Sequence, residues 1–120
     1  MPGPPTRRTP APAAAPTLPF AGCSTFTDAS ATSANRTISF ACCSYTPSCL
    51  QIAVGQSVTF SGSFSFHPLD QACGPAPVIA TTASGASASF TFTDPGVYGF
   101  NCQVHGSAAG TGMAGAILVQ

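Results

Sequence analysis

The sequence predicts an all-β sandwich, and three observations lead to this class. Ser and Thr alternate with Phe, Val and Ile along short runs, which is typical of half-buried strands. Lys and Glu, the usual residues of helix surfaces, are absent, and no apolar stretch has the 3.6-residue period of a helix. Turn residues separate the runs at a spacing typical of sandwiches, so we expect about seven to eight strands.

The chain divides into three segments. Residues 1–19, "MPGPPTRRTPAPAAAPTLP", are rich in Pro, Ala and Thr and cannot bury a core. We expect an extended, flexible linker that spans at most ~60 Å at ~3.1 Å per residue. It either spaces the domain from a membrane or wall anchor or is a tail without a role. Residues 20–35 are predicted as an irregular lead-in, and residues 36–120 as the folded domain.

Seven runs within the domain have the composition of strands. Alternation in the first places Ile38, Phe40 and Cys42 on its inward face. The turn Asp94-Pro95-Gly96 precedes Tyr98, which we predict to form a structural tyrosine corner. The predicted strands are residues 37–42, 50–54, 57–64, 78–83, 86–93, 97–102 and 115–120.

Composition excludes several classes of function. Only 5% of the residues are charged and the net charge is zero, so the chain lacks the basic stripe of a nucleic-acid-binding protein. Three scattered aspartates do not supply a catalytic carboxylate pair. No stretch reaches the roughly 18 apolar residues of a transmembrane helix, and the first residues do not resemble a signal peptide. An export signal upstream of this start and a misassigned Met1 both stay open.

Six cysteines in a small chain indicate an oxidising compartment, and we expect an extracytoplasmic protein, periplasmic or on the cell surface. If Cys102 is a metal ligand, five cysteines allow two disulfides and one free thiol. The inward parity of Cys42 makes it the predicted free, buried thiol. Three pairings of the other four are possible, and we favour Cys23–Cys43 with Cys49–Cys73. A bridge from Cys23 would fasten the lead-in to the sandwich.

One short segment concentrates soft donor groups. Cys102, His105 and Met113 lie within "FNCQVHGSAAGTGMAG", although Met113 is the only methionine besides Met1. His67, the only other histidine, follows the predicted third strand. Thiolate, imidazole and thioether together suit copper. The alternative is that the three are unrelated: half of a disulfide, a surface imidazole and a core thioether.

The segment "FTDPGVYGFNCQVH...GMAGAILV" resembles the C-terminal half of the plastocyanin-like cupredoxins, the blue copper proteins. Upstream, "YTPSCLQIAVGQSVTFSGSFSFHPL" resembles their second and third strands followed by the first histidine ligand, here His67. The resemblance covers about Arg36 to Gln120 and implies a Greek-key, cupredoxin-like sandwich. The residues that match the family signature are Gly96, Tyr98, Phe100, Cys102, His105, Gly112, Met113 and Gly115.

The resemblance also implies a site for one copper ion that cycles between Cu(I) and Cu(II). His67, Cys102 and His105 would be the equatorial ligands and Met113 the weak axial ligand, a set that suits electron transfer. Apolar side chains should surround this end of the sandwich and limit the access of water. We expect them to be Phe60, Phe64, Phe66, Phe100 and Val104.

The sequence departs from the family in two places. Seven residues separate His105 from Met113, where plastocyanin-like members commonly have about four, so we expect "GSAAGTG" to bulge outward. Pro68 stands where the family usually has Asn with an N–H aimed at the cysteine sulfur, and proline has no N–H. Val104 stands where plastocyanin has proline. We infer that one N–H···S hydrogen bond replaces the other.

These features predict an extracytoplasmic electron carrier that meets redox partner proteins through an apolar patch around His105. Pro68, Val104, Ala108 and Ala109 would form this patch, and we expect a monomer that residues 1–19 can tether. The alternatives are a copper-delivery module on the same fold and a metal-free, disulfide-stapled interaction domain, in which Cys102 would be oxidised. We do not expect an enzyme, because multicopper oxidases and nitrite reductases need more histidine ligands than the two present.

Overall fold

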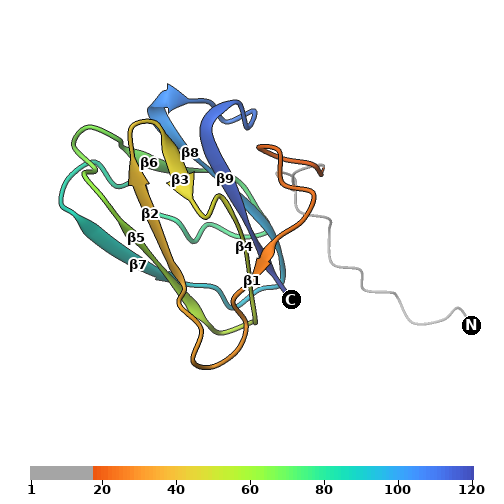
Figure 1. Cartoon of the computed structure of the whole chain (residues 1–120). Helices are drawn as coiled ribbons and strands as arrows, with labels where there is room; N and C mark the ends of the chain where they lie inside the picture. The colour runs from red at the N-terminus through yellow and green to blue at the C-terminus, as the bar shows by residue number, and fades with distance from the viewer. Residues whose placement is uncertain (1–17) are drawn as a thin grey trace, which may run out of the picture.

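A computed structural model describes residues 18–120, which form two β-sheets packed face to face (Figure 1). Most of the predicted linker, residues 1–17, lies outside the described residues. Across residues 18–120, no helix is long and apolar enough to cross a membrane. The strands are β1 (Thr27–Asp28), β2 (Thr37–Ala41), β3 (Ser44–Thr46), β4 (Cys49–Ile52), β5 (Ser57–Ser61), β6 (Leu69–Cys73), β7 (Ser87–Thr91), β8 (Gly96–Gly106) and β9 (Gly112–Val119).

The chain passes repeatedly from one sheet to the other. One sheet has the order β1-β4-β9-β8-β6 and the other the order β3-β2-β5-β7. From β3 to β8 each successive strand lies in the opposite sheet, so strands that pair are mostly distant in sequence. Strand β8 lies between β9 and β6 and is antiparallel to both. This arrangement confirms the predicted all-β sandwich.

Six of the seven predicted strands are confirmed, as β2, β4, β5, β7, β8 and β9. The structure describes nine strands rather than seven to eight, because β1, β3 and β6 were not predicted. The first two are too short to show a period. Strand β6 has the sequence Leu-Asp-Gln-Ala-Cys, in which two polar residues interrupt the apolar alternation.

The strand predicted at residues 78–83 is wrong, and the side chain of Gln71 explains why. Its Oε1 accepts hydrogen bonds from the backbone N–H groups of Val78 and Ile79, at 2.9 and 2.8 Å. Its Nε2 donates to the carbonyl oxygen of Ala76 at 2.8 Å. These bonds satisfy backbone groups that a strand would pair with a neighbour. Only Thr82 makes a β-bridge, with Leu69.

The core lies between the sheets and is rich in aromatic rings. Phe60 and Phe100 pack edge to face with ring centroids 5.0 Å apart. Tyr98 is fully buried, and its hydroxyl donates a 2.8 Å hydrogen bond to the carbonyl oxygen of Asp94. This bond confirms the predicted tyrosine corner. The largest fully buried side chains are Tyr98, Phe60, Phe64, Phe92, Phe100, Ile38, Leu50, Ile52 and Leu69.

The predicted disulfide pairing is wrong. The bridges are Cys23–Cys49 and Cys42–Cys43, and the free cysteines of the described chain are Cys73 and Cys102. Cys42 is exposed because β2 ends at Ala41, which pairs with Ser44 of β3. Cys42 and Cys43 thus form the turn of a hairpin, where strand parity no longer applies.

The lead-in is fastened to the sandwich in two ways. Cys23 forms its bridge with Cys49 at the start of β4, and β1 pairs in parallel with β4. Fastening by Cys23 was expected, although with a different partner. Residues 20–35 therefore include one short strand and contribute an edge to the five-stranded sheet.

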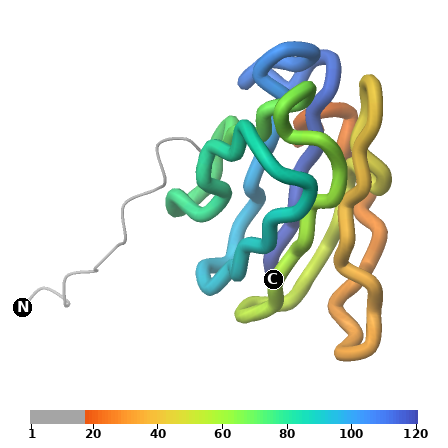
Figure 2. Tube along the Cα trace, turned by 90° about the vertical axis from the view of Figure 1, so that its left-hand side faces the viewer, coloured from red at the N-terminus to blue at the C-terminus, as the bar shows by residue number. Residues whose placement is uncertain are grey.

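Three connections gather at one end of the sandwich, away from the C-terminus. They are the β2–β3 turn, the segment between β5 and β6, and the loop between β8 and β9, and Figures 1 and 2 show them together. These connections carry Cys42 and Cys43, His67, and the residues that follow Cys102. This end of the molecule holds the candidate site.

Candidate metal centre

His67 is placed just ahead of β6. Its backbone N–H donates to the carbonyl oxygen of Ser63 at 3.0 Å, within a turn that follows β5. Leu69, two residues later, pairs with Cys102 of β8, so the β6–β8 ladder brings the histidine beside the cysteine. His67 is 7% exposed, and its imidazole meets the ring of Phe40 edge-on, with centroids 6.0 Å apart.

Cys102 and His105 both come from the last part of β8. The alternation through Tyr98 and Phe100 turns Cys102 inward, and all three are fully buried. The pairing of β8 with β9 shifts register between Asn101 and Gly106, so this part of β8 bulges away from the regular ladder. The bulge lets His105 return toward Cys102, although the residue itself is exposed.

Three donor atoms form a compact triangle. Nδ1 of His67 lies 3.2 Å from Nδ1 of His105. The sulfur of Cys102 lies 3.9 Å from the first nitrogen and 3.8 Å from the second. A metal ion held about 2.0 Å from each nitrogen and about 2.3 Å from the sulfur would separate its donors by about 3–4 Å. The triangle therefore fits one ion.

Cys102 is a free thiol, which argues against the metal-free alternative. An interaction domain without metal was expected to use this cysteine in a disulfide. Within residues 18–120 the two disulfides use other cysteines. A buried sulfur beside two imidazoles is a soft donor set, and copper suits it.

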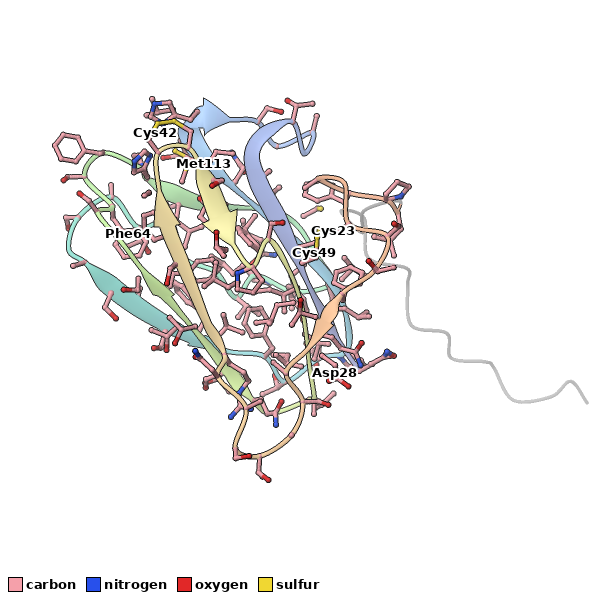
Figure 3. All side chains as sticks on the ribbon, viewed as in Figure 1. Cys23, Asp28, Cys42, Cys49, Phe64 and Met113 are labelled. Atoms are coloured by element: carbon pink, nitrogen blue, oxygen red, sulfur yellow. A yellow bond between two sulfur atoms is a disulfide. The ribbon has the colours of Figure 1, made fainter. Side chains whose placement is uncertain are left out.

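Met113 lies on β9 opposite the bulge. It falls between two register pairs, Asn101 with Ala114 and Gly106 with Gly112, and is 1% exposed. The residues between Gly106 and Gly112 form a closed turn, in which the N–H of Ser107 donates to the carbonyl oxygen of Thr111 at 3.0 Å. The extra residues of the loop therefore project outward, as expected, and the methionine stays in the core. Figure 3 shows it at the same end of the molecule as Cys42.

The apolar surround is only partly as predicted. Phe60, Phe64 and Phe100 are fully buried. Phe66 and Val104 are not, with exposed fractions of 72% and 64%. Phe66 lies in the turn just before His67, and Val104 lies in the bulge of β8 just before His105. These two residues belong to the surface around the centre rather than to its lining.

Tyr45 is a residue near the centre that sequence reasoning missed. It lies in the unpredicted strand β3, is 4% exposed, and packs on Phe100 with ring centroids 4.8 Å apart. Burial, with a smaller effect of the neighbouring Cys102, raises the pKa of the Tyr45 phenol. Its hydroxyl has no hydrogen-bond partner among the described residues. A "CCSYT" stretch offers no periodic signal that would have identified it.

The sandwich fold and a buried Cys with two His donors define a cupredoxin-like copper protein. Residues 32–120 match the model of the copper-binding proteins of the plastocyanin/azurin family. This match spans most of the chain, and the chain belongs to that family. The cofactor of this family is copper.

Several solved structures share the fold of this chain. An amicyanin mutant in its oxidised form is 21% identical, with 75% of this chain and 86% of that chain covered at a TM-score of 0.56. A second amicyanin mutant, in its reduced state, is 24% identical, with 70% and 80% covered at 0.53. A copper-containing nitrite reductase from Thermus scotoductus SA-01 is 29% identical over 70% of this chain, but only 22% of that chain is covered (TM-score 0.54). No curated protein sequence matches the chain significantly.

Proposed function

We propose that the protein is an extracytoplasmic electron carrier with one type 1 copper centre. In this proposal His67, Cys102 and His105 are the equatorial ligands, and Met113 is the weak axial ligand. The observation that carries it is the triangle of two Nδ1 atoms and one sulfur, with separations of 3.2, 3.8 and 3.9 Å. Copper in such a site carries one electron as it alternates between Cu(I) and Cu(II).

The surrounding residues would hold the donors in place during electron transfer. Cys102 lies on β8, which pairs with β9 on one side and β6 on the other, and His67 comes two residues before Leu69, which pairs with Cys102. The sandwich would therefore limit the movement of both side chains. The fully buried rings of Phe64 and Phe100 exclude water from the inner side of the site. A rigid, dry pocket keeps the rearrangement between oxidation states small.

The exposed histidine gives the centre its contact with the outside. His105 is exposed whereas His67 is buried, so the edge of the His105 ring is the shortest route between the centre and a partner protein. Of the predicted patch residues, Val104, Ala108 and Ala109 are exposed, whereas Pro68 is half-buried. Phe66, one residue before His67, adds exposed apolar surface. In this proposal Phe66, Val104, Ala108 and Ala109 surround the ring edge. We call these four residues the apolar face. It is the proposed docking surface for redox partners.

One feature supports a carrier role rather than enzymatic catalysis, and a second supports a location outside the cytoplasm. The nitrite reductase likeness extends over only 22% of that protein, so it concerns a single cupredoxin-like domain. The bridge between Cys23 and Cys49 favours an oxidising compartment. We therefore propose a monomeric carrier of the periplasm or cell surface, with residues 1–19 as a tether.

The test is the visible spectrum of the protein after addition of Cu(II). An intense thiolate-to-copper absorption is expected in the wild-type chain and should be absent from Cys102→Ser. Cys73→Ser, which removes the other free cysteine, is the matched control and should stay blue. A colourless wild-type protein with full copper loading would refute the proposal. Rapid loss of copper to a chelator would instead favour a delivery module.

A further inference from the structure

A second group of metal-binding side chains lies beside the candidate centre. The sulfur atoms of Cys42 and Cys43 and a ring nitrogen of His105 all lie within 4.8 Å of one another. All three residues are exposed. His105 thus belongs to two groups, one buried with His67 and Cys102 and one at the surface with the cysteine pair.

The Cys42–Cys43 bridge contributes little to the cohesion of the fold. It joins adjacent residues, so it closes no loop of chain and removes almost no entropy from the unfolded state. The bridge between Cys23 and Cys49, by contrast, spans 26 positions, and Cys23 is fully buried. The pair lies at the exposed turn between β2 and β3, where another thiol can reach its sulfur atoms.

The chemistry of this surface group points to a soft monovalent metal. Two thiolates and one imidazole favour Cu(I), whereas Mg²⁺ and Ca²⁺ need oxygen ligands. Only three acidic side chains exist in the whole sequence, and one of them, Asp28, lies at the opposite end of the molecule from Cys42 (Figure 3). Because the thiols are exposed, a Cu(I)–thiolate donor can exchange ligands with them directly.

We propose that Cys42 and Cys43, once reduced, form with His105 a surface site for Cu(I), through which copper enters the buried centre. A dithiol reductant supplies two electrons and two protons to the disulfide and is itself oxidised to a disulfide. Cu(I) then displaces the two thiol protons without changing its oxidation state. Entry into the centre follows when the ion, still held by His105, exchanges the two thiolates for Cys102 and His67. The Cys102 thiol gives up its proton, and the freed thiolates of Cys42 and Cys43 take up two, one from Cys102 and one from water. This step rests on the proposed function.

The first experiment measures Cu(I) affinity in full-length chains that lack the buried thiolate. Cys102→Ser is reduced with dithiothreitol, freed of it without oxygen, and titrated with Cu(I) against bicinchoninate. The triple variant Cys42→Ser/Cys43→Ser/Cys102→Ser is the comparison, since both keep any affinity of the remaining histidines. Cys73→Ser/Cys102→Ser is the matched control, because it also removes a cysteine but leaves the pair intact.

We expect the reduced Cys102→Ser chain and its Cys73 control to bind Cu(I) more than about 100-fold tighter than the triple variant, since even an outer-sphere partner is worth about 10–100-fold. X-ray absorption should show two sulfur neighbours beyond any that the triple variant shows. The same Cys102→Ser chain with its Cys42–Cys43 disulfide intact should bind as weakly as the triple variant. This comparison needs no further substitution. Equal affinities in all of these samples would overturn the surface site.

The second experiment measures entry. Reduced, copper-free wild type and Cys42→Ser/Cys43→Ser receive Cu(I) from a glutathione complex, and samples are oxidised at intervals to read the thiolate-to-copper absorption. The wild type should load at least about tenfold faster, whereas Cys73→Ser should load as the wild type does. Equal rates would overturn the entry role. A wild type that never turns blue would refute the proposed function and the entry role with it, while the titration would still decide the surface site.

Discussion

The two buried tyrosines near the core show how one hydrogen bond distinguishes similar residues. Both are almost inaccessible to solvent, and burial raises the pKa of each phenol. The hydroxyl of Tyr98 has a partner in the carbonyl oxygen of Asp94 at 2.8 Å. The hydroxyl of Tyr45 has none in the described part of the chain. A buried polar group without a partner costs free energy that a hydrogen bond would offset.

Removing the hydroxyl should therefore affect the free energy of unfolding differently at the two positions. Tyr98→Phe should lower the free energy of unfolding by about 1 kcal/mol, because it leaves a carbonyl without its donor. Tyr45→Phe should leave it unchanged or raise it by up to about 1 kcal/mol, since no bond is lost. Urea unfolding followed by circular dichroism measures both. A clear loss of stability in Tyr45→Phe would reveal a partner for its hydroxyl.

The same phenols predict a loss of stability in alkali. A pKa raised above the usual tyrosine value of 10.0 means that the folded state holds its proton more tightly than the unfolded state. The stabilisation that the protonated phenols give the folded state is fully present below pH 10 and decreases as the pH rises above 10. Thermal unfolding between about pH 8 and about pH 11 should show a falling melting temperature, less steep in Tyr45→Phe. An equal slope in that variant would contradict the role of Tyr45.

Val104 provides the test of the inferred N–H···S bond. Pro68 cannot donate to the sulfur of Cys102. Val104 has an N–H and lies in the bulge of β8, where it has no register partner on β6 or β9. Val104→Pro should lower the midpoint potential, because the donor stabilises the more electron-rich reduced site. The shift should be tens of millivolts, as a tenfold change in relative stability is about 59 mV for one electron. An unchanged potential in a folded, blue variant would count against this bond.

At the scale of elements, the β8–β9 loop determines where two ligands lie. Gly106 and Gly112 pair at its base, and a Cβ on Gly112 would collide with the carbonyl oxygen of His105. Gly112 also has a φ of +70°, which side chains rarely adopt. The close approach of the strands at this point keeps His105 and Met113 in the same end of the sandwich.

Gly112→Ala should therefore damage the centre as well as the fold. We expect a loss of roughly 1–3 kcal/mol and a weakened or shifted thiolate-to-copper band, because the strands must separate. Gly85→Ala is the matched control: its φ is +90°, but no atom lies within 4 Å of the added Cβ. Gly85→Ala should lose some stability and keep its spectrum. Identical spectra of both variants and the wild type would show that the loop base does not position the ligands.

At the scale of the whole molecule, the described surface carries few charges and the edge of the centre is apolar. Arg36, Asp28, Asp70 and Asp94 are the charged residues of the described part, and the apolar face contains none of them. Without charge clusters, the encounter with a partner has little long-range steering. Association then depends on the orientation of two patches.

The rate of electron transfer should accordingly depend little on salt. Between about 0.01 M and about 0.5 M salt, we expect the second-order rate constant to change by less than about threefold. Phe66→Ala, which reduces the apolar face, should slow transfer at every salt concentration. Stopped-flow kinetics with a surrogate redox protein measures both. A steep fall in rate with salt would contradict docking through the apolar face.

The sequence alone determined the class of fold and the candidate donors. Alternation along β2, β4, β5 and β8 depends only on neighbouring residues, so the strands and the inward direction of Cys102 could be predicted. The scarcity of His and Met restricted the possible ligands to His67, His105 and Met113. These features are local, or follow from composition.

Contacts between distant segments were decided only by the tertiary structure. The pairing of Cys23 with Cys49, the exposure of Cys42, and the meeting of Cys43 with His105 all depend on where strands end and which strands become neighbours. The polar bonds of Gln71, which replace a predicted strand by a loop, are likewise made between elements. Period and parity describe one strand at a time. They contain no information on turn geometry or on which sheet edge a loop approaches, because those follow from packing the whole sandwich.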